Sequence, residues 1–281
     1  MSAIAFGLLA ALLWGTSAIV GTRLVRLAGT WTSIATTMLI GLALVAPFAF
    51  ASDLPQAPLR DWAWAISSGF CYVTASACWL LAVRTGKVSV VTPIVSTDGA
   101  MAALIAVAAF DETLRAGVAA ALAVIVTGVV TASIRRDLDE GSRFTGRELG
   151  LSLASAGLFG FTFVASAQAQ EDIGVVWTLI ASRATAVAVL LPLALVLGAL
   201  RLPRKAIPFA VGMAALDLGG YAAFLAGAPA SVAITSVLAS QYAIVAVAGG
   251  FLVLGERLTR LQMSGIAVTV AGVAALAALR A

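Results

Sequence analysis

Histidine is absent from this sequence, and cysteine and acidic residues are scarce, with two cysteines and 13 aspartates and glutamates among 281 residues. Cys71 and Cys78 lie seven positions apart in one apolar stretch, which separates them by about 10 Å of helical rise, too far for a disulfide. Without histidine or clustered cysteine, a metal site would need carboxylates alone, and these are scattered. The sequence therefore predicts no metal site and no cofactor, and it argues against an enzyme.

Charged residues of both signs are also few. They make up 11% of the chain, hydrophobic residues make up 62%, and the mean hydropathy is +1.07, whereas soluble domains have about 25% charged and about 45–50% apolar residues. This composition predicts a protein surrounded by membrane lipid. The isoelectric point near 9.6 is explained by an excess of Lys and Arg on the cytoplasmic side of a membrane, so we expect no nucleic-acid partner.

Apolar stretches follow one another along the whole chain with short interruptions between them. A helix that crosses a bilayer uses about 20 apolar residues, and ten stretches of about this length fit the chain. They cover residues 3–22, 31–51, 62–83, 88–110, 116–134, 148–168, 174–200, 206–227, 231–254 and 261–279. The sequence therefore predicts an all-α membrane protein with ten transmembrane helices.

The two halves of the chain repeat each other. A shift of 144 positions places residues 82–131 on residues 226–275 without a gap. The aligned pairs include Ser96 and Ser240, Glu112 and Glu256, and Gly128 and Gly272. We predict a first five-helix repeat over residues 1–137, a hydrophilic linker over 138–147 and a second repeat over 148–281. Because five is an odd number, the second repeat must be inverted, an arrangement that transporters use with the substrate site between the halves.

Three motifs resemble those of a known family. They are the run Ala11-Leu12-Leu13-Trp14-Gly15, the stretch from Pro93 through Phe110-Asp111-Glu112-Thr113-Leu114, and Leu254-Gly255-Glu256-Arg257-Leu258 before a helix that carries Gly272. With these motifs the chain resembles the EamA family of the drug/metabolite transporter (DMT) superfamily over nearly its whole length. The resemblance implies two inverted five-helix repeats and export of amino acids or related metabolites, commonly in exchange for protons.

Basic residues are distributed unevenly between the interruptions. Thirteen Lys and Arg residues follow odd-numbered stretches, whereas Arg60, Arg115 and Arg280 follow even-numbered ones. Because Lys and Arg concentrate in cytoplasmic loops, this count places both termini in the periplasm of a bacterial inner (plasma) membrane. The family resemblance implies cytoplasmic termini in many relatives, and we follow the count because it uses this sequence.

Three ionisable residues, Asp98, Arg183 and Asp217, fall deep inside apolar stretches, where charge is costly and usually functional. Arg183 has two possible carboxylate partners, so one interpretation is a buried ion pair that only fixes helix packing. The other interpretation is that Asp98 or Asp217 carries a proton during transport, since no histidine is present to do so. We expect Asp217→Asn to uncouple transport more severely than Asp98→Asn, because Asp217 shares a helix face with Tyr221 and neighbours a Gly-Gly pair.

Aromatic and small polar residues complete a predicted binding wall around these charges. Helical spacing places Tyr72, Ser76 and Trp79 on one helix face. The predicted substrate-binding residues are Trp14, Tyr72, Ser76, Trp79, Ser96, Asp98, Arg183, Asp217, Tyr221, Ser240, Gln241 and Tyr242. Alternatively, the aromatic residues belong to interfacial belts and the hydroxyl residues to helix packing. Glu112 and Glu256 each precede an apolar helix, and we expect each of them to cap the N-terminus of that helix.

These features predict a secondary active transporter that exports amino acids or related small polar metabolites by proton antiport with alternating access. An exporter of cationic aromatic drugs is the alternative within the same class, with Trp79 and Tyr221 as cation–π partners, although Arg183 would repel such cations. A non-transporting membrane scaffold is the alternative from a different class. We expect the protein to be a monomer or a homodimer.

The predicted orientation can be tested with a reporter that is active only in the periplasm. The reporter should be active when fused after Ala281 and inactive when inserted at Gly141, because the basic loop residues keep that side in the cytoplasm. The reverse pattern in whole-cell activity assays would invert the orientation and leave the fold unchanged.

Overall fold

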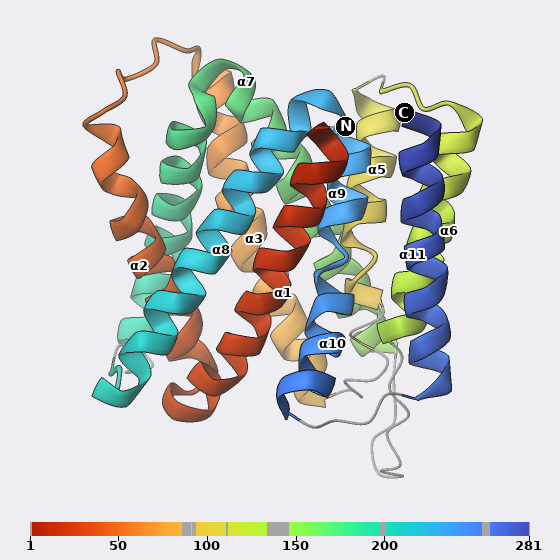
Figure 1. The fold of residues 1–281 in the computed structure, drawn as a ribbon. Helices are drawn as coiled ribbons and strands as arrows, with labels where there is room; N and C mark the ends of the chain where they lie inside the picture. The colour runs from red at the N-terminus through yellow and green to blue at the C-terminus, as the bar shows by residue number, and fades with distance from the viewer. Residues whose placement is uncertain are drawn as a thin grey trace.

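The computed structural model describes residues 2–85, 91, 94–110, 112–133, 146–196, 201–254 and 259–280. Within these residues every regular element is a helix, as predicted, and the helices pack into one bundle (Figure 1). The α-helices are α1 (Ser2–Ala28), α2 (Thr30–Ala49), α3 (Leu59–Thr85), α5 (Asp98–Ala109), α6 (Ala116–Ser133), α7 (Gly146–Val196), α8 (Ile207–Gly227), α9 (Val232–Ala239), α10 (Tyr242–Leu254) and α11 (Arg260–Arg280). Two short 3-10 helices, η1 (Arg204–Ala206) and η2 (Ala228–Ala230), flank α8.

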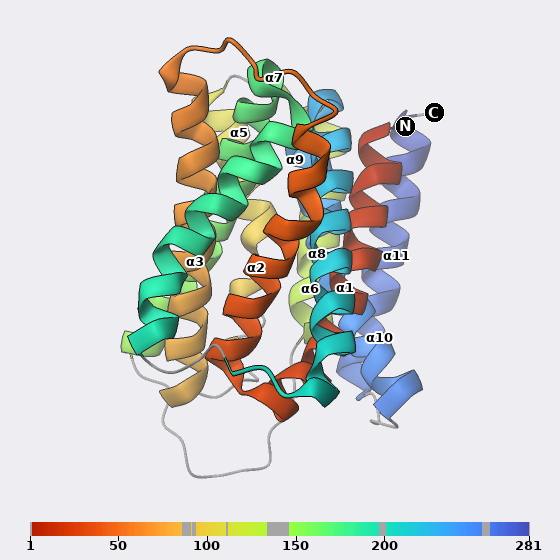
Figure 2. The same cartoon turned by 90° about the vertical axis from the view of Figure 1, so that its left-hand side faces the viewer.

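The long helix α7 turns back on itself. Gly174 interrupts it with φ 73° and ψ 166°, and glycine adopts this left-handed φ because it has no Cβ atom to clash. Figure 2 shows the two segments of α7 meeting at one end of the bundle. They correspond to the predicted stretches 148–168 and 174–200, although the first segment continues to the kink instead of ending at residue 168.

Several helices have the length and composition of membrane spans, so the chain is a multi-pass membrane protein. In the described part of the chain, four helical segments are long and apolar enough to cross a membrane: Ser2–Ala28, Thr30–Ala49, Gly146–Val196 and Arg204–Ala230. Shorter apolar helices cover Asp98–Ala109, Ala116–Ala132, Val232–Ala246 and Arg260–Leu276. By this criterion the ten predicted crossings are not confirmed, and that number stays a prediction.

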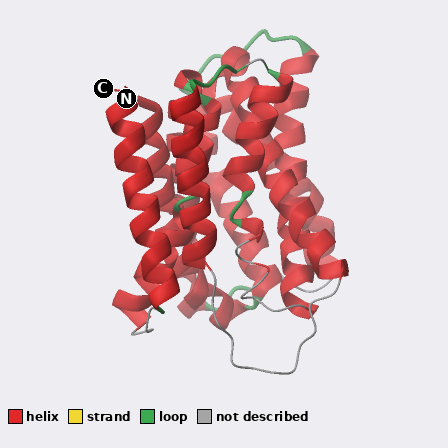
Figure 3. Ribbon diagram, turned by 90° about the vertical axis from the view of Figure 1, so that its right-hand side faces the viewer, coloured by secondary structure: helices red, strands yellow, loops and turns green. Residues whose placement is uncertain are grey.

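Two predicted helices, over residues 88–110 and 231–254, are broken in the middle. The second consists of α9 and α10, which are separated by residues 240–241, and Figure 1 shows this break about halfway along the bundle. In the first, α5 begins only after a turn at residues 96–97. Short non-helical segments are visible at this depth in Figure 3. The prediction of two continuous helices was wrong because hydropathy does not register a backbone break inside an apolar stretch.

The two breaks share one hydrogen-bond pattern. The Thr97 amide donates to the Ile94 carbonyl at 3.2 Å. At the equivalent positions, shifted by 144, the Gln241 amide donates to the Leu238 carbonyl at 3.1 Å. Both bonds span three residues where a regular α-helix spans four. The Val237 carbonyl instead accepts from the Gln241 side-chain amide at 2.9 Å, and such pairing is what permits a break where lipid offers no hydrogen bonds.

The two halves of the chain run in opposite directions and are interleaved. In Figure 1, α1 descends from the N-terminus, whereas the first segment of α7 ascends to its kink. Gly15 of α1 and Gly160 of α7 correspond at a shift of 145, so equivalent helices are antiparallel. Across the halves, α1 packs on α8, α9 and α10, α3 packs on α7, and α6 packs on α11. Most of the predicted linker, residues 138–147, lies outside the described residues.

Glu112 caps a helix, but not the one that was predicted. Its carboxylate accepts hydrogen bonds from the Ser231 hydroxyl and from the Ala233 amide, the latter at 3.1 Å. These donors lie at the start of α9 in the opposite half, whereas the prediction assigned Glu112 to α6, the helix that follows it. The carboxylate therefore joins the two halves. Glu256, its counterpart in the repeat, lies outside the described residues.

Glycine allows α6 and α11 to approach closely. A Cβ atom on Gly128 would overlap the Thr269 hydroxyl and lie 2.7 Å from the Thr269 backbone nitrogen. On the same helix, a Cβ atom on Gly117 would meet only the Leu279 methyl groups at 3.5 Å, an ordinary contact distance. Close packing through small residues replaces the hydrophobic effect between helices in lipid.

Gly128→Ala should therefore force α6 and α11 apart and destabilise the folded protein by about 1–3 kcal/mol, the usual cost of overpacking. Gly117→Ala is the matched control and should unfold like the unmodified protein. Thermal unfolding in detergent measures the difference between the two variants. Equal effects of the two substitutions would contradict a close approach at Gly128.

Candidate functional site

An ion pair lies deep in the bundle. Arg183 stands nine residues beyond the α7 kink, about 13 Å along the helix, and only 3% of it is exposed. Its Nη2 atom lies 2.6 Å from the Oδ2 atom of Asp217, which occupies the midpoint of α8. Of the two carboxylates considered from the sequence, Asp217 is thus the partner of Arg183.

Side chains from both halves surround the Arg183 guanidinium. The rings of Tyr72 on α3 and Tyr221 on α8 lie 5.7 and 5.5 Å from its Cζ atom, within the range of a cation–π interaction. Nη1 donates to the Met38 sulfur on α2 at 2.9 Å. Nε is buried and has no hydrogen-bond partner among the described residues. The cation is therefore held by π faces and one weak acceptor in addition to Asp217, and one of its strong donors is unused.

Met38 and Ser68 belong to this group but were missed from the sequence. The Tyr221 hydroxyl donates to the Ser68 hydroxyl at 3.4 Å. Ser68 lies one helical turn before Tyr72, so the same spacing that links Tyr72 and Ser76 could have found it. Met38 carries no such signal, because it lies on an apolar helix with no charged neighbour in sequence.

Trp14 positions the ion pair from α1. Its indole nitrogen donates to the Asp217 backbone carbonyl at 3.1 Å, and its ring stacks on Phe163 at 5.6 Å between centroids. A Cβ atom on Gly220 would lie 2.6 Å from the indole, so only glycine leaves room for the ring. Of the two glycines near Asp217 in α8, the second, Gly220, is therefore the one that allows Trp14 to pack closely.

Asp98 forms a second polar centre at the start of α5. Its Oδ1 atom accepts from the Gly99 amide at 2.8 Å, and its Oδ2 atom accepts from the Tyr242 hydroxyl at 3.3 Å. Asp98 is 3% exposed. Asp98 and Tyr242 occupy equivalent positions of the two repeats, so this bond joins one half of the protein to the other at the helix breaks.

Some of the remaining predicted residues lie near Asp98, and the others lie outside both polar centres. Ser96, Ser240 and Gln241 are buried at the breaks next to Asp98 and Tyr242. Ser76 donates to the Tyr72 carbonyl of its own helix at 2.8 Å, which is a packing role for its hydroxyl. Trp79 is 38% exposed, and the structure does not bring it into either centre.

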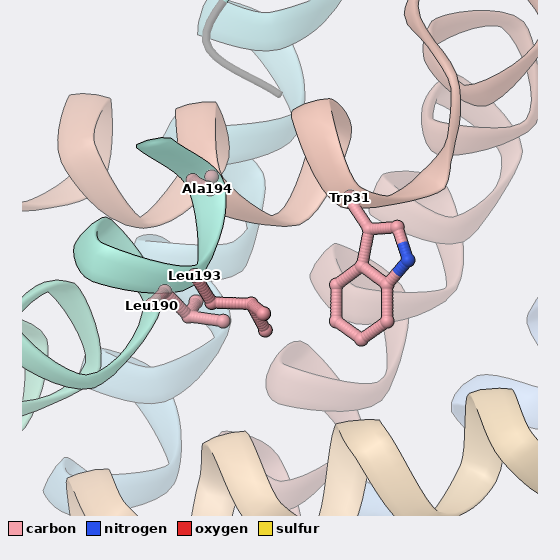
Figure 4. A pocket seen from close by; sticks show the side chains of 5 residues that line it. Trp31, Leu190, Leu193 and Ala194 are labelled. Atoms are coloured by element: carbon pink, nitrogen blue, oxygen red, sulfur yellow. The ribbon is translucent and has the colours of Figure 1, made fainter. Parts of the chain in front are cut away.

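A shallow apolar hollow, too narrow to hold a water molecule, lies elsewhere, between α2 and the second segment of α7 (Figure 4). Trp31, Ala35, Leu190, Leu193 and Ala194 line it. None of these side chains offers a charged group or a hydrogen bond for a polar molecule, apart from the indole nitrogen of Trp31. The hollow is therefore a weaker candidate for a metabolite site than the ion pair.

A multi-pass helical bundle with buried charges between two repeated halves is typical of membrane transporters. The chain belongs to the EamA-like transporter family, whose model matches it twice, over residues 1–134 and 147–278. The double match confirms the two-repeat organisation and places the protein among the membrane transporters of the DMT superfamily, which are transporters rather than enzymes.

A solved structure shares this architecture. It is titled "Crystal structure of protein", has a TM-score of 0.78 and is 17% identical in sequence. The alignment covers 99% of this chain and 97% of that chain. At this identity the similarity shows the fold over the whole length. No curated protein matches the chain.

The contribution of the ion pair to stability can be tested by substitution. Arg183→Leu or Asp217→Leu alone should destabilise the protein by about 3–5 kcal/mol, because each leaves an uncompensated buried charge. The double variant Arg183→Leu/Asp217→Leu should recover most of that loss, since it leaves no charge behind. Thermal unfolding in detergent measures all three variants, and a double variant no more stable than the single variants would contradict the pairing.

Proposed function

We propose that the protein is a secondary active transporter that exports amino acids or related small zwitterionic metabolites by proton antiport with alternating access. In this proposal ten transmembrane helices form two inverted five-helix repeats in a bacterial inner membrane, with both termini in the periplasm. The observation that carries the proposal is the Arg183–Asp217 ion pair, which is buried between the halves and whose Nε donor has no partner in the described part of the chain.

The position of the pair supports a substrate site. Met38 and Tyr72 come from the first half, whereas Arg183, Asp217 and Tyr221 come from the second. In transporters built from inverted repeats, the substrate binds near the midplane between the repeats and beside broken helices. The bundle contains two such breaks, before α5 and between α9 and α10, and α5 and α9 pack on α7 and α8, the helices that carry the pair.

The charges of the pair favour a zwitterion. Arg183 and Asp217 carry opposite charges, so the site adds no net charge, and a substrate of zero net charge keeps it neutral in an apolar medium where unpaired charge is costly. The carboxylate of an amino acid would accept from Arg183, including its free Nε, and the ammonium group would approach Asp217. Such a substrate would replace one internal ion pair by two intermolecular ones.

The two alternatives are less well supported. A cationic aromatic drug would need an aromatic face, but Tyr221 already presents its ring to Arg183, and Trp79 lies outside the site. A non-transporting scaffold would also account for the close burial of the pair, but it would leave the free Nε of a buried arginine without a role. Membership of a transporter family also favours transport.

Transport can be measured in liposomes that contain the purified protein. Exchange of radiolabelled zwitterionic amino acids should exceed exchange of anionic and cationic metabolites, and an outward-directed flux should follow an imposed pH gradient. The double variant Arg183→Leu/Asp217→Leu should stay folded and lose exchange, because it removes both partners of the zwitterion. Arg60→Leu, which changes an exposed arginine outside the site, is the control and should retain exchange. A folded double variant with full exchange would place the substrate site elsewhere or favour the scaffold.

A further inference from the structure

The two buried carboxylates differ in what compensates their charge. Asp217 lies 2.6 Å from the Arg183 guanidinium, so neutralising Asp217 would leave a buried cation without its partner. Asp98 has no basic partner among the described residues, and its oxygens accept from the Gly99 amide and the Tyr242 hydroxyl. Asp98 is therefore the carboxylate that can change its charge without breaking an ion pair.

The elements packed against α5 provide few other titratable groups near Asp98. On α7, Gly160 lies so close to α5 that an added Cβ atom would be 2.9 Å from the Asp98 carbonyl. The ionisable residues of that α7 segment are Arg147, Glu148, Glu171 and Asp172, all at least 11 positions from Gly160. The helix α9 has no titratable residue between Val232 and Ala239, and α10 contributes Tyr242. Among the residues that the structure describes, Asp98 is thus insulated from other charges.

Tyr242 links Asp98 to the ion-pair site. Its backbone carbonyl faces α1, where a Cβ atom on Gly15 would lie 2.9 Å from it. Gly15 follows Trp14, whose indole nitrogen donates to the Asp217 carbonyl at 3.1 Å. A change at Asp98 can therefore reach the ion pair through Tyr242 and the α1 segment that carries Trp14.

The Asp98–Tyr242 hydrogen bond also joins equivalent positions of the two repeats. In alternating access, one repeat moves against the other about the site, and a bond between equivalent positions lies where the two repeats meet. At the helix breaks next to both residues, three-residue hydrogen bonds replace part of the regular helical pattern, so the backbone can bend there. A change of charge at this bond would therefore affect how the two repeats are held against each other.

We propose that Asp98 binds and releases the coupling proton, and that its hydrogen bond with Tyr242 transmits the change between the two halves. This proposal rests on the proton antiport proposed above. It reverses the order expected from the sequence, in which Asp217 was the stronger candidate, because Asp217 is committed to Arg183.

The step is a simple proton transfer. In the charged form, the Tyr242 hydroxyl donates to the Asp98 carboxylate and holds α5 against α10. A proton from water on one side bonds to a carboxylate oxygen, the carboxyl group becomes neutral, and the charge-assisted hydrogen bond becomes a weaker neutral one. Release of the proton to water on the other side restores the anion and the stronger bond.

Infrared difference spectroscopy tests proton binding without relying on transport. When the pH is lowered, the unmodified protein should gain C=O bands of protonated carboxylic acids, and Asp98→Asn should lack the one band that belongs to Asp98. Asn keeps the shape of the side chain. Its Oδ1 atom can accept from the Gly99 amide and its Nδ2 group can donate to the Tyr242 hydroxyl oxygen, so this variant should fold. Tyr242→Phe should retain the band at a higher frequency, because one hydrogen bond to the carboxyl group is lost. Asp61→Asn, which changes a buried carboxylate at the start of α3, is the control and should leave the band unchanged.

Liposome transport separates this proposal from the proposed function. Asp98→Asn should exchange substrate down its gradient but lose accumulation driven by a pH gradient. A band that persists in Asp98→Asn, the absence of any such band in the unmodified protein, or full pH-driven accumulation by Asp98→Asn would overturn the assignment. If the band behaves as expected but the unmodified protein shows no pH-driven transport, proton binding at Asp98 stands and the antiport proposal fails.

Discussion

The Arg183–Asp217 ion pair is the interaction on which the arrangement around it depends. A buried arginine in an apolar span requires a counter-charge and acceptors, because its desolvation costs more than most single contacts return. The bundle provides them from both halves: a carboxylate and a tyrosine ring from α8, and a second ring and a sulfur from α3 and α2. Trp14 then fixes the Asp217 segment of α8 through its backbone carbonyl. The pair thus organises helices that are distant in sequence.

Repetition explains the scaffold, and departures from repetition explain the chemistry. The helix breaks at residues 96–97 and 240–241 are equivalent and use the same three-residue hydrogen bond. The residue that follows each break differs, however, since one repeat has Asp98 and the other Tyr242. A symmetric pair of breaks therefore brings together an acid and a phenol, which can form a hydrogen bond that two identical carboxylates could form only by sharing a proton.

In the described structure, hydrogen bonds join the two halves near α5 and α9. Glu112 binds the start of α9, and the Gly99 carbonyl accepts from the Ser236 hydroxyl at 3.2 Å. A Cβ atom on Gly99 would overlap the Ser236 carbonyl, so these helices are in direct backbone contact. Alternating access would require such contacts to separate.

The sequence alone determined the membrane class, the all-helical fold and the two-repeat organisation, because each depends on hydropathy and on self-similarity, which are properties of the chain itself. It also identified Arg183, Asp98 and Asp217, since charge inside an apolar stretch is visible without coordinates. Only the tertiary structure decided that Asp217 is the partner of Arg183, that Asp98 meets Tyr242, and that Glu112 caps α9 instead of α6. These choices depend on which helices become neighbours, and residues separated by 34 to 144 positions carry no local signal of their contact.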